Sequence, residues 1–151
     1  MSAEICCFLP RACHLIVPEE WKFDRIGEHV TIGWNASQQA RRAVIDALPL
    51  LKDAISVSVV IVDPETNDSH GQQPGSDIAR YLARHGAAVT VAQTASNGET
   101  IANALLRQAR DCESDLIVIG AYSHSRTGEL IFGGVTRSLT RHVAIPTLIA
   151  H

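Results

Sequence analysis

The sequence has 151 residues, a length that fits one domain. Hydrophobic residues make up 46% of it and charged residues 19%, a balance that argues against a disordered chain. The net charge of -3 comes without a run of Lys or Arg, and no apolar segment reaches the ~18 residues of a membrane span, so we expect neither a nucleic-acid nor a membrane partner.

The N-terminal segment contains an apolar patch, but it lacks the basic start of a secretory signal. The four cysteines show no metal-binding spacing and no disulfide framework, which predicts reduced thiols and a cytoplasmic protein. Residues 13–17 have the composition of a short strand, and residues 18–21 that of a linker. We therefore expect an N-terminal extension over residues 1–29 and a single domain over residues 30–151.

From residue 30 onward, strand and helix patterns alternate. Short runs rich in β-formers predict strands, and apolar residues at helical spacing predict amphipathic helices between them. The predicted strands are Val30–Trp34, Ser56–Val62, Ala87–Ala92, 116–120 and Pro146–Ala150. Near-continuous apolar strands that alternate with helices indicate parallel pairing with both faces covered. The expected fold is therefore α/β, a doubly wound five-stranded parallel sheet with helices on both faces.

Local patterns predict where the helices begin and end. Asn35 with Gln38 is a candidate capping pair for the first helix, and Pro49 is expected to kink or end that helix just before it. Ser96 and Glu99 have the spacing of a capping box ahead of the third helix.

A glycine-rich stretch, Gly120 to Leu139, follows the fourth predicted strand and leads into the last predicted helix. It contains four glycines, with hydroxyls and an arginine between them. Ligands of doubly wound sheets bind beyond the carboxyl ends of the strands. Glycines let the backbone approach a ligand, a helix N-terminus attracts anions, and Ser123, Arg126 and Thr136 can donate to phosphate oxygens. The stretch predicts an anion-binding loop, against the alternative that the glycines serve only turns.

Together with the strand ahead of it, this stretch resembles the C-terminal segment of universal stress proteins. The motif of the nucleotide-binding branch is G-2x-G-9x-G-[S/T]. Gly120 and Gly133 fill its first and third places, whereas Ser123 and Gly134 stand where Gly and Ser/Thr belong. Asn35 stands where the family has an acidic residue after the first strand. The resemblance covers essentially the whole α/β unit.

The resemblance implies a stress-response regulatory protein that binds ATP or a related adenine nucleotide, with Mg²⁺ accompanying the nucleotide, and without substantial turnover. The substituted motif positions leave a second reading open, a dimerisation or interaction module without nucleotide, and a slow ATPase is the third. No set of catalytic residues and no metal site is apparent. The implied nucleotide-binding residues are Gly33, Asn35, Val62, Ile119, Gly120, Ser123, Arg126, Gly133, Gly134, Val135 and Thr136.

The resemblance also bears on assembly. In the family the last strand is a sheet edge at which two-fold dimers meet, which implies a homodimer through Thr147–Ala150. A second option is that Cys13–Val17 covers this edge, because that segment mimics the last strand of a preceding domain. The chain would then resemble the second half of a tandem universal stress protein, the alternative being an ordinary N-terminal extension. Either way, we expect the N-terminal strand and the last strand to lie close together.

Three other kinds of residue could carry chemistry. The histidines show no metal-binding spacing, and a surface position is expected for each, although His124 lies within the glycine-rich stretch. Asp63 follows the second predicted strand and is interpreted as the first residue of a loop rather than a ligand of a metal. Trp34 is assigned to packing rather than to stacking on a base.

Overall fold

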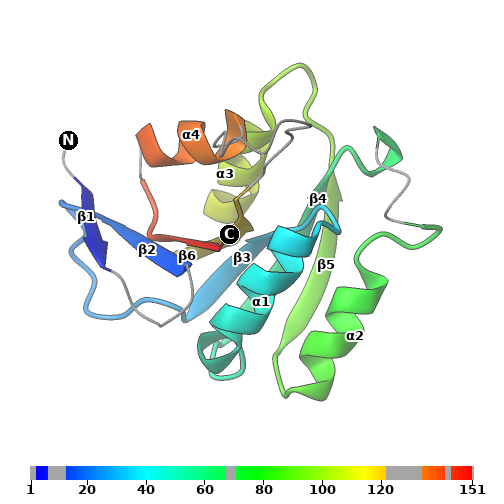
Figure 1. The fold of residues 1–151 in the computed structure, drawn as a ribbon, viewed down its shortest axis with the longest axis horizontal. Helices are drawn as coiled ribbons and strands as arrows, with labels where there is room; N and C mark the ends of the chain where they lie inside the picture. The colour runs from blue at the N-terminus through cyan, green and yellow to red at the C-terminus, as the bar shows by residue number, and fades with distance from the viewer. Residues whose placement is uncertain (1–2, 7–12, 67–70, 122–133, 142–143, 151) are drawn as a thin grey trace.

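The fold is a single seven-stranded sheet covered by helices (Figure 1). The computed structural model describes residues 3–6, 13–66, 71–121, 134–141 and 144–150. The elements in chain order are β1 (Ala3–Cys6), β2 (Cys13–Pro18), β3 (His29–Gly33), α1 (Gln38–Leu51), β4 (Ser56–Val62), the 3-10 turn η1 (Pro64–Thr66), α2 (Ser76–Arg84), β5 (Val89–Thr94), α3 (Ile101–Asp111), β6 (Leu116–Gly120), α4 (Gly134–Arg141) and β7 (Thr147–Ala150). The strand order is β1-β2-β7-β6-β3-β4-β5.

The five strands from β7 to β5 in this order are mutually parallel. The chain leads from β3 through β4 to β5 on one side, and then returns to β6 and β7 on the other side of β3. Strand order therefore reverses between β3 and β6, which confirms the predicted doubly wound α/β class.

The two faces of the sheet form two separate cores, because successive side chains of a strand point to opposite faces. Val59 and Ile61 of β4 pack in the core beneath α1 and α2. Val60 and Val62, the alternate residues of the same strand, pack in the core beneath α3 and α4. Figure 1 shows the two helix pairs on opposite sides of the sheet.

Helix α1 continues past Pro49, so the expectation that the proline would kink or end the helix just before it is wrong. The helix runs to Leu51, whose side chain is fully buried in the core beneath α1 and α2. The backbone N–H of Lys52 still donates to the carbonyl of Leu48 at 3.1 Å. Burial of Leu51 therefore offsets the single backbone hydrogen bond that proline cannot donate.

The strand at Cys13–Pro18, β2, pairs antiparallel with β7, with Cys13 opposite Ala150. Because β6 pairs with the other side of β7, the expectation that the last strand is a sheet edge is wrong. The second option, in which the N-terminal segment covers the last strand, agrees with this pairing. A further strand that the sequence did not predict, β1, pairs antiparallel with β2. The edge strands of the sheet are thus β1 and β5.

Docking of β2 buries the thiol of Cys13 beside α1. Cys13 is 4% exposed and belongs to the core beneath α1 and α2. Burial raises the pKa of this thiol, and the negative charge of Asp46 on α1 raises it further. Since the thiolate is the reactive form, Cys13 is an inert packing residue while β2 is docked.

The start of β5 and the cap of α3 also differ from the predictions. The strand covers Val89–Thr94, two residues later than expected, and its end lies level with the end of β4. Ser96 does not cap α3, because the helix begins only at Ile101; its backbone N–H donates instead to the carboxylate of Asp63. The N-cap is Thr100, whose hydroxyl accepts a hydrogen bond from the backbone N–H of Asn103 at 3.2 Å.

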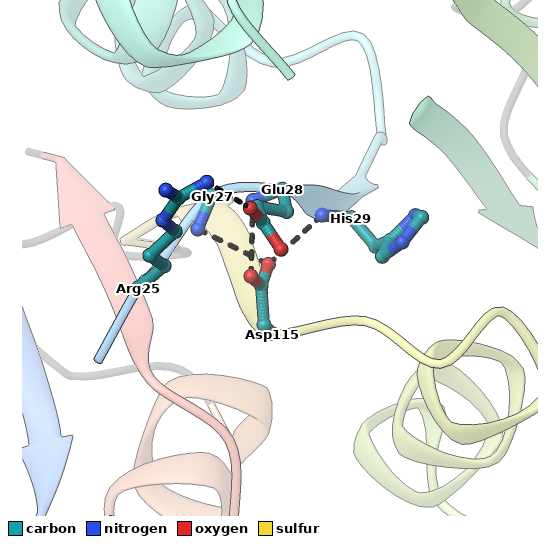
Figure 2. Close-up of polar contacts among 5 residues, drawn as sticks. All are labelled: Arg25, Gly27, Glu28, His29 and Asp115. Carbon is teal, nitrogen blue, oxygen red and sulfur yellow. Dashed lines mark hydrogen bonds and ion pairs between the residues drawn. The ribbon is translucent and has the colours of Figure 1, made fainter. Parts of the chain in front are cut away.

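At the amino ends of the strands, the carboxylate of Asp115 binds three consecutive backbone N–H groups (Figure 2). Gly27, Glu28 and His29 donate to it at 3.1, 2.9 and 3.0 Å. Gly27 has a φ of 99°, a conformation that favours glycine and that turns the N–H groups toward one anion. The start of β6 is thereby connected to the segment that enters β3.

Candidate functional site

The place where strand order reverses, at the carboxyl ends of β3 and β6, is where a ligand of a doubly wound sheet is expected. Five of the residues predicted to bind nucleotide are described there, at the ends of three neighbouring strands. They are Gly33, Asn35, Val62, Ile119 and Gly120. The structure therefore brings Asn35 and Val62 close to Gly120, the first glycine of the motif.

The turn from β3 into α1 is built by local hydrogen bonds. The side-chain carbonyl of Asn35 accepts from the backbone N–H of Ser37 at 3.1 Å, and the hydroxyl of Ser37 accepts from the N–H of Ala40 at 3.1 Å. Between them, Ala36 has a φ of 57°. The helix thus begins with Ser37 as its N-cap, and the predicted pairing of Asn35 with Gln38 as a cap is wrong.

The sequence pattern did not predict Ser37 as the N-cap, because Asn is an equally good capping residue and Asn35 comes first in the chain. The first apolar position of the helix, Ala40, lies three residues after Ser37. That spacing places the Ser37 hydroxyl within reach of the N–H of Ala40, whereas Asn35 lies too far back and instead closes a turn over two residues. The start of the apolar pattern could therefore have identified the cap.

Gly120 is required by close contact between β6 and the first turn of α1. A Cβ at this position would collide with the backbone of Gln39 and Ala40. Gly33 meets only side chains, since its Cβ would lie 2.9 Å from a methyl of Leu105 and 3.0 Å from one of Ile119. Among the described residues, both glycines allow neighbouring segments to pack closely at the place where a ligand is expected.

Ile119 and Trp34 lie on opposite faces of the sheet at this edge. Ile119 packs in the core beneath α3 and α4, with Val62 packed against the same core. Trp34 is 8% exposed and packs in the core beneath α1 and α2. The assignment of Trp34 to packing is confirmed.

Asp63 connects the ends of β4 and β5. Its carboxylate accepts a hydrogen bond of 2.9 Å from the backbone N–H of Ser96, and its own N–H donates to the carbonyl of Thr94 at 2.9 Å. Hydrogen bonds with Ser96, from the side chain first and the backbone second, lower the pKa of the Asp63 carboxyl. The residue also has a φ of 47°. These contacts agree with the interpretation of Asp63 as the residue that begins a loop.

The phosphate side of the predicted site is described only in part. Gly134, Val135 and Thr136 form the first turn of α4. Because β6 and β7 are parallel, α4 returns across the sheet and begins at the carboxyl edge. Ser123, Arg126, Gly133 and His124 lie outside the described residues. Within the described ranges, no group of three His, Cys, Asp or Glu is placed to hold a metal ion, and no helix is both long enough and apolar enough to cross a membrane.

The strand order and the parallel pairing define a doubly wound α/β protein, in which a ligand is expected at the ends of β3, β4 and β6. Residues 28–151 match the universal stress protein family. The chain belongs to this family. A search of curated proteins gave no match.

Solved structures show the same fold. A universal stress protein from Archaeoglobus fulgidus is 23% identical with a TM-score of 0.67, over 83% of this chain and 100% of the other. A second protein from Archaeoglobus fulgidus is 16% identical with a TM-score of 0.71, over 90% of this chain but 49% of the other, so this chain spans about half of it. A universal stress protein in complex with cAMP is 18% identical with a TM-score of 0.58, over 83% of this chain and 98% of the other.

Proposed function

We propose that this protein is a stress-response regulator that binds ATP or a related adenine nucleotide at the carboxyl edge of β3, β4 and β6, without substantial turnover. The observation that carries the proposal is the position of Gly120. It ends β6 where strand order reverses, directly against the first turn of α1. A distant member of the family is described in complex with cAMP, which supports an adenine nucleotide as the ligand class.

Each proposed contact has a physical reason. Asn35 and Val62, at the ends of β3 and β4, are assigned to the ribose and base. The first turn of α4, with Gly134 to Thr136, is assigned to phosphate, because a helix N-terminus combines free N–H donors with a partial positive charge. Gly33, Ile119 and Gly120 shape the floor between them.

The remaining residues of the proposed phosphate side come from the resemblance. Ser123, Arg126 and Gly133 supply donors and a close backbone approach, and Mg²⁺ would accompany the nucleotide. These groups would bind the ground state and the transition state alike, so binding without rapid chemistry is the expected outcome.

Mass spectrometry of small molecules released from the purified protein tests the proposal directly, together with a thermal shift on adding ATP. Gly133→Asp places a negative charge where phosphate is expected and should abolish the shift. Ala88→Asp is the matched control, because Ala88 is exposed just before β5, at the amino ends of the strands. We expect the parent protein to release an adenine nucleotide. We expect the thermal shift with ATP to be lost in Gly133→Asp and kept in the control variant. No released nucleotide and no shift with ATP would favour the interaction module instead.

Asn35→Asp sharpens the test. The carboxylate keeps an acceptor for the N–H of Ser37 and adds the charge that family members place beside the ribose. We expect about tenfold tighter binding of ATP, the value of one charged hydrogen bond. Rapid multiple-turnover release of ADP by the parent protein that disappears in Asp63→Ala or His124→Ala would make the protein an enzyme instead.

A homodimer, which we propose as the assembly, faces a constraint: β7 is paired on both sides within one chain. Association through the last strand would require β2 to leave and would expose the buried Cys13. Light scattering combined with thiol labelling of Cys13 separates such a dimer from one that uses another surface.

A further inference from the structure

A cavity of about 290 Å³ lies between the start of α1 and the start of α2. Its walls come from the turn after β3, from α1 and from the N-terminal half of α2. The lining residues used below are Trp34, Arg41, Ile45, Asp77, Ile78 and Tyr81. The volume is at the lower end of the ~300–1,000 Å³ of ligand pockets, which suits one ring with a short polar group rather than a nucleotide.

This cavity is separate from the proposed nucleotide site. Trp34 and Ile78 belong to the core beneath α1 and α2, and Tyr81 packs against that core. Val62 and Ile119, on the proposed nucleotide side, face the core beneath α3 and α4. The two places therefore face opposite sides of the sheet, and both border the turn after β3, in which Asn35 lies between Trp34 and Ala36.

The backbone at the cavity is unusual at two points. Ala36, which lines it, has a φ of 57°, and Gly75, at the N-cap of α2, has a φ of 81°. A Cβ on Gly75 would lie 2.7 Å from the side chain of Ile61, so the glycine lets α2 begin close to the sheet. Of the two, only Ala36 is strained, and a non-glycine residue held in the left-handed region is a feature of ligand sites.

The chemistry of the walls is divided between apolar and charged groups. The rings of Trp34 and Tyr81 and the branched side chain of Ile78 form apolar surface. Arg41 and Asp77 are exposed charged residues of opposite sign that line the same cavity. They do not pair with each other, because the ion pairs in the described part of the chain join other residues.

We propose that this cavity is a second ligand site, which takes a small zwitterion with an aromatic ring, of the chemical class of an aromatic amino acid. The ring lies against Trp34 and Tyr81, where stacking and burial stabilise it. The carboxylate binds the guanidinium of Arg41, and the ammonium group binds the carboxylate of Asp77. A ligand with both charges satisfies both groups at once, whereas a nucleotide phosphate would be repelled by Asp77.

The test uses Trp34 as the reporter. The chain has two tryptophans, so Trp21→Phe leaves Trp34 as the only one. Phenylalanine, 3-phenylpropionate and phenethylamine share one ring, and only phenylalanine carries both charges. Titration followed by Trp34 fluorescence should show saturable binding, with each analogue about three- to fivefold weaker than phenylalanine because one exposed ion pair is lost.

Charge variants assign the two contacts. Arg41→Gln should remove the advantage of phenylalanine over phenethylamine, and Asp77→Asn should remove its advantage over 3-phenylpropionate. Arg42→Gln is the matched control, since Arg42 is also exposed on α1 and is not among the residues that line the cavity. Arg41, Arg42 and Asp77 are all exposed, so the three variants should fold like the parent protein.

Amide chemical shifts locate the ligand. Phenylalanine should shift residues 41–45 and 73–81 and leave Val62 and Gly120 unchanged. It should do so equally in Gly133→Asp, which separates this site from the nucleotide site. The proposal is overturned if no ligand shifts these residues up to its solubility, if all three ligands bind equally, or if Arg42→Gln has the same effect as Arg41→Gln.

Discussion

Two aspartates connect neighbouring strands at opposite edges of the sheet, and they do so with very different strength. Asp115, at the amino edge, is partly buried and accepts three hydrogen bonds from the backbone ahead of β3 (Figure 2). Asp63, at the carboxyl edge, is hydrogen-bonded by a single residue, Ser96, through its side chain and through its backbone N–H, the latter at 2.9 Å. The amino edge is the more firmly connected of the two.

The surroundings of the two aspartates differ in the same direction. Next to Asp115, the buried hydroxyls of Thr31 and Ser114 hydrogen-bond each other at 2.7 Å, which connects β3 to the start of β6 a second time. At the carboxyl edge, the turn after β3 is held by hydrogen bonds that span two or three residues, those of Asn35 and Ser37. The turn itself is therefore built from short-range contacts, and it can adjust to a ligand without loss of the long-range connections that hold the sheet.

The largest effect is expected for Asp115→Ala. Three backbone N–H groups would lose a charged acceptor, and the free energy of unfolding should fall by about 2–4 kcal/mol. Urea denaturation followed by circular dichroism measures the change. Asp111→Ala is the control, because Asp111 is exposed at the end of α3 and its removal should cost less than about 0.5 kcal/mol. Equal losses in the two variants would contradict the structural role of Asp115.

A smaller loss is expected for Gly120→Ala, at the carboxyl edge. The added methyl meets the backbone of Gln39 and Ala40, which can move only with the first turn of α1, so the loss should be about 1–3 kcal/mol. Gly33→Ala should cost less, since the atoms it meets are methyl groups of side chains that can rotate away. If Gly33→Ala is the more harmful variant, the close contact between β6 and α1 is not what Gly120 serves.

The smallest effect is expected for Asp63→Asn, and it should depend on pH. The folded-state pKa of Asp63 is lowered, so its ionised form contributes stability above the ordinary value of 3.8, and this contribution is lost as the pH falls through the folded-state pKa. The difference in unfolding free energy between the parent protein and Asp63→Asn should therefore be present at neutral pH and vanish in acid. A difference that is constant with pH would show that the charge contributes nothing. The exposure of the group keeps the effect small.

Much of the fold could be read from the sequence, because strand and helix periods are local. The strands at Ser56–Val62 and 116–120 agree with β4 and β6 residue for residue, and their near-continuous apolar character predicted burial on both faces. The position of Gly120 at the end of β6 also followed from the chain alone. Alternation of strands and helices then leaves few arrangements other than a doubly wound sheet.

Tertiary structure decided what depends on residues far apart in the chain. Asp115 acts on backbone groups 86 to 88 positions away, which no local pattern reveals. The helix continues past Pro49 because Leu51 is buried, and β2 rather than solvent or another chain lies beside β7. The cavity between α1 and α2 exists only because the sheet sets the two helices side by side. Local propensities determine where helices and strands form. The free energy of burial and of long-range hydrogen bonds then determines which of these helices and strands pack or pair with each other.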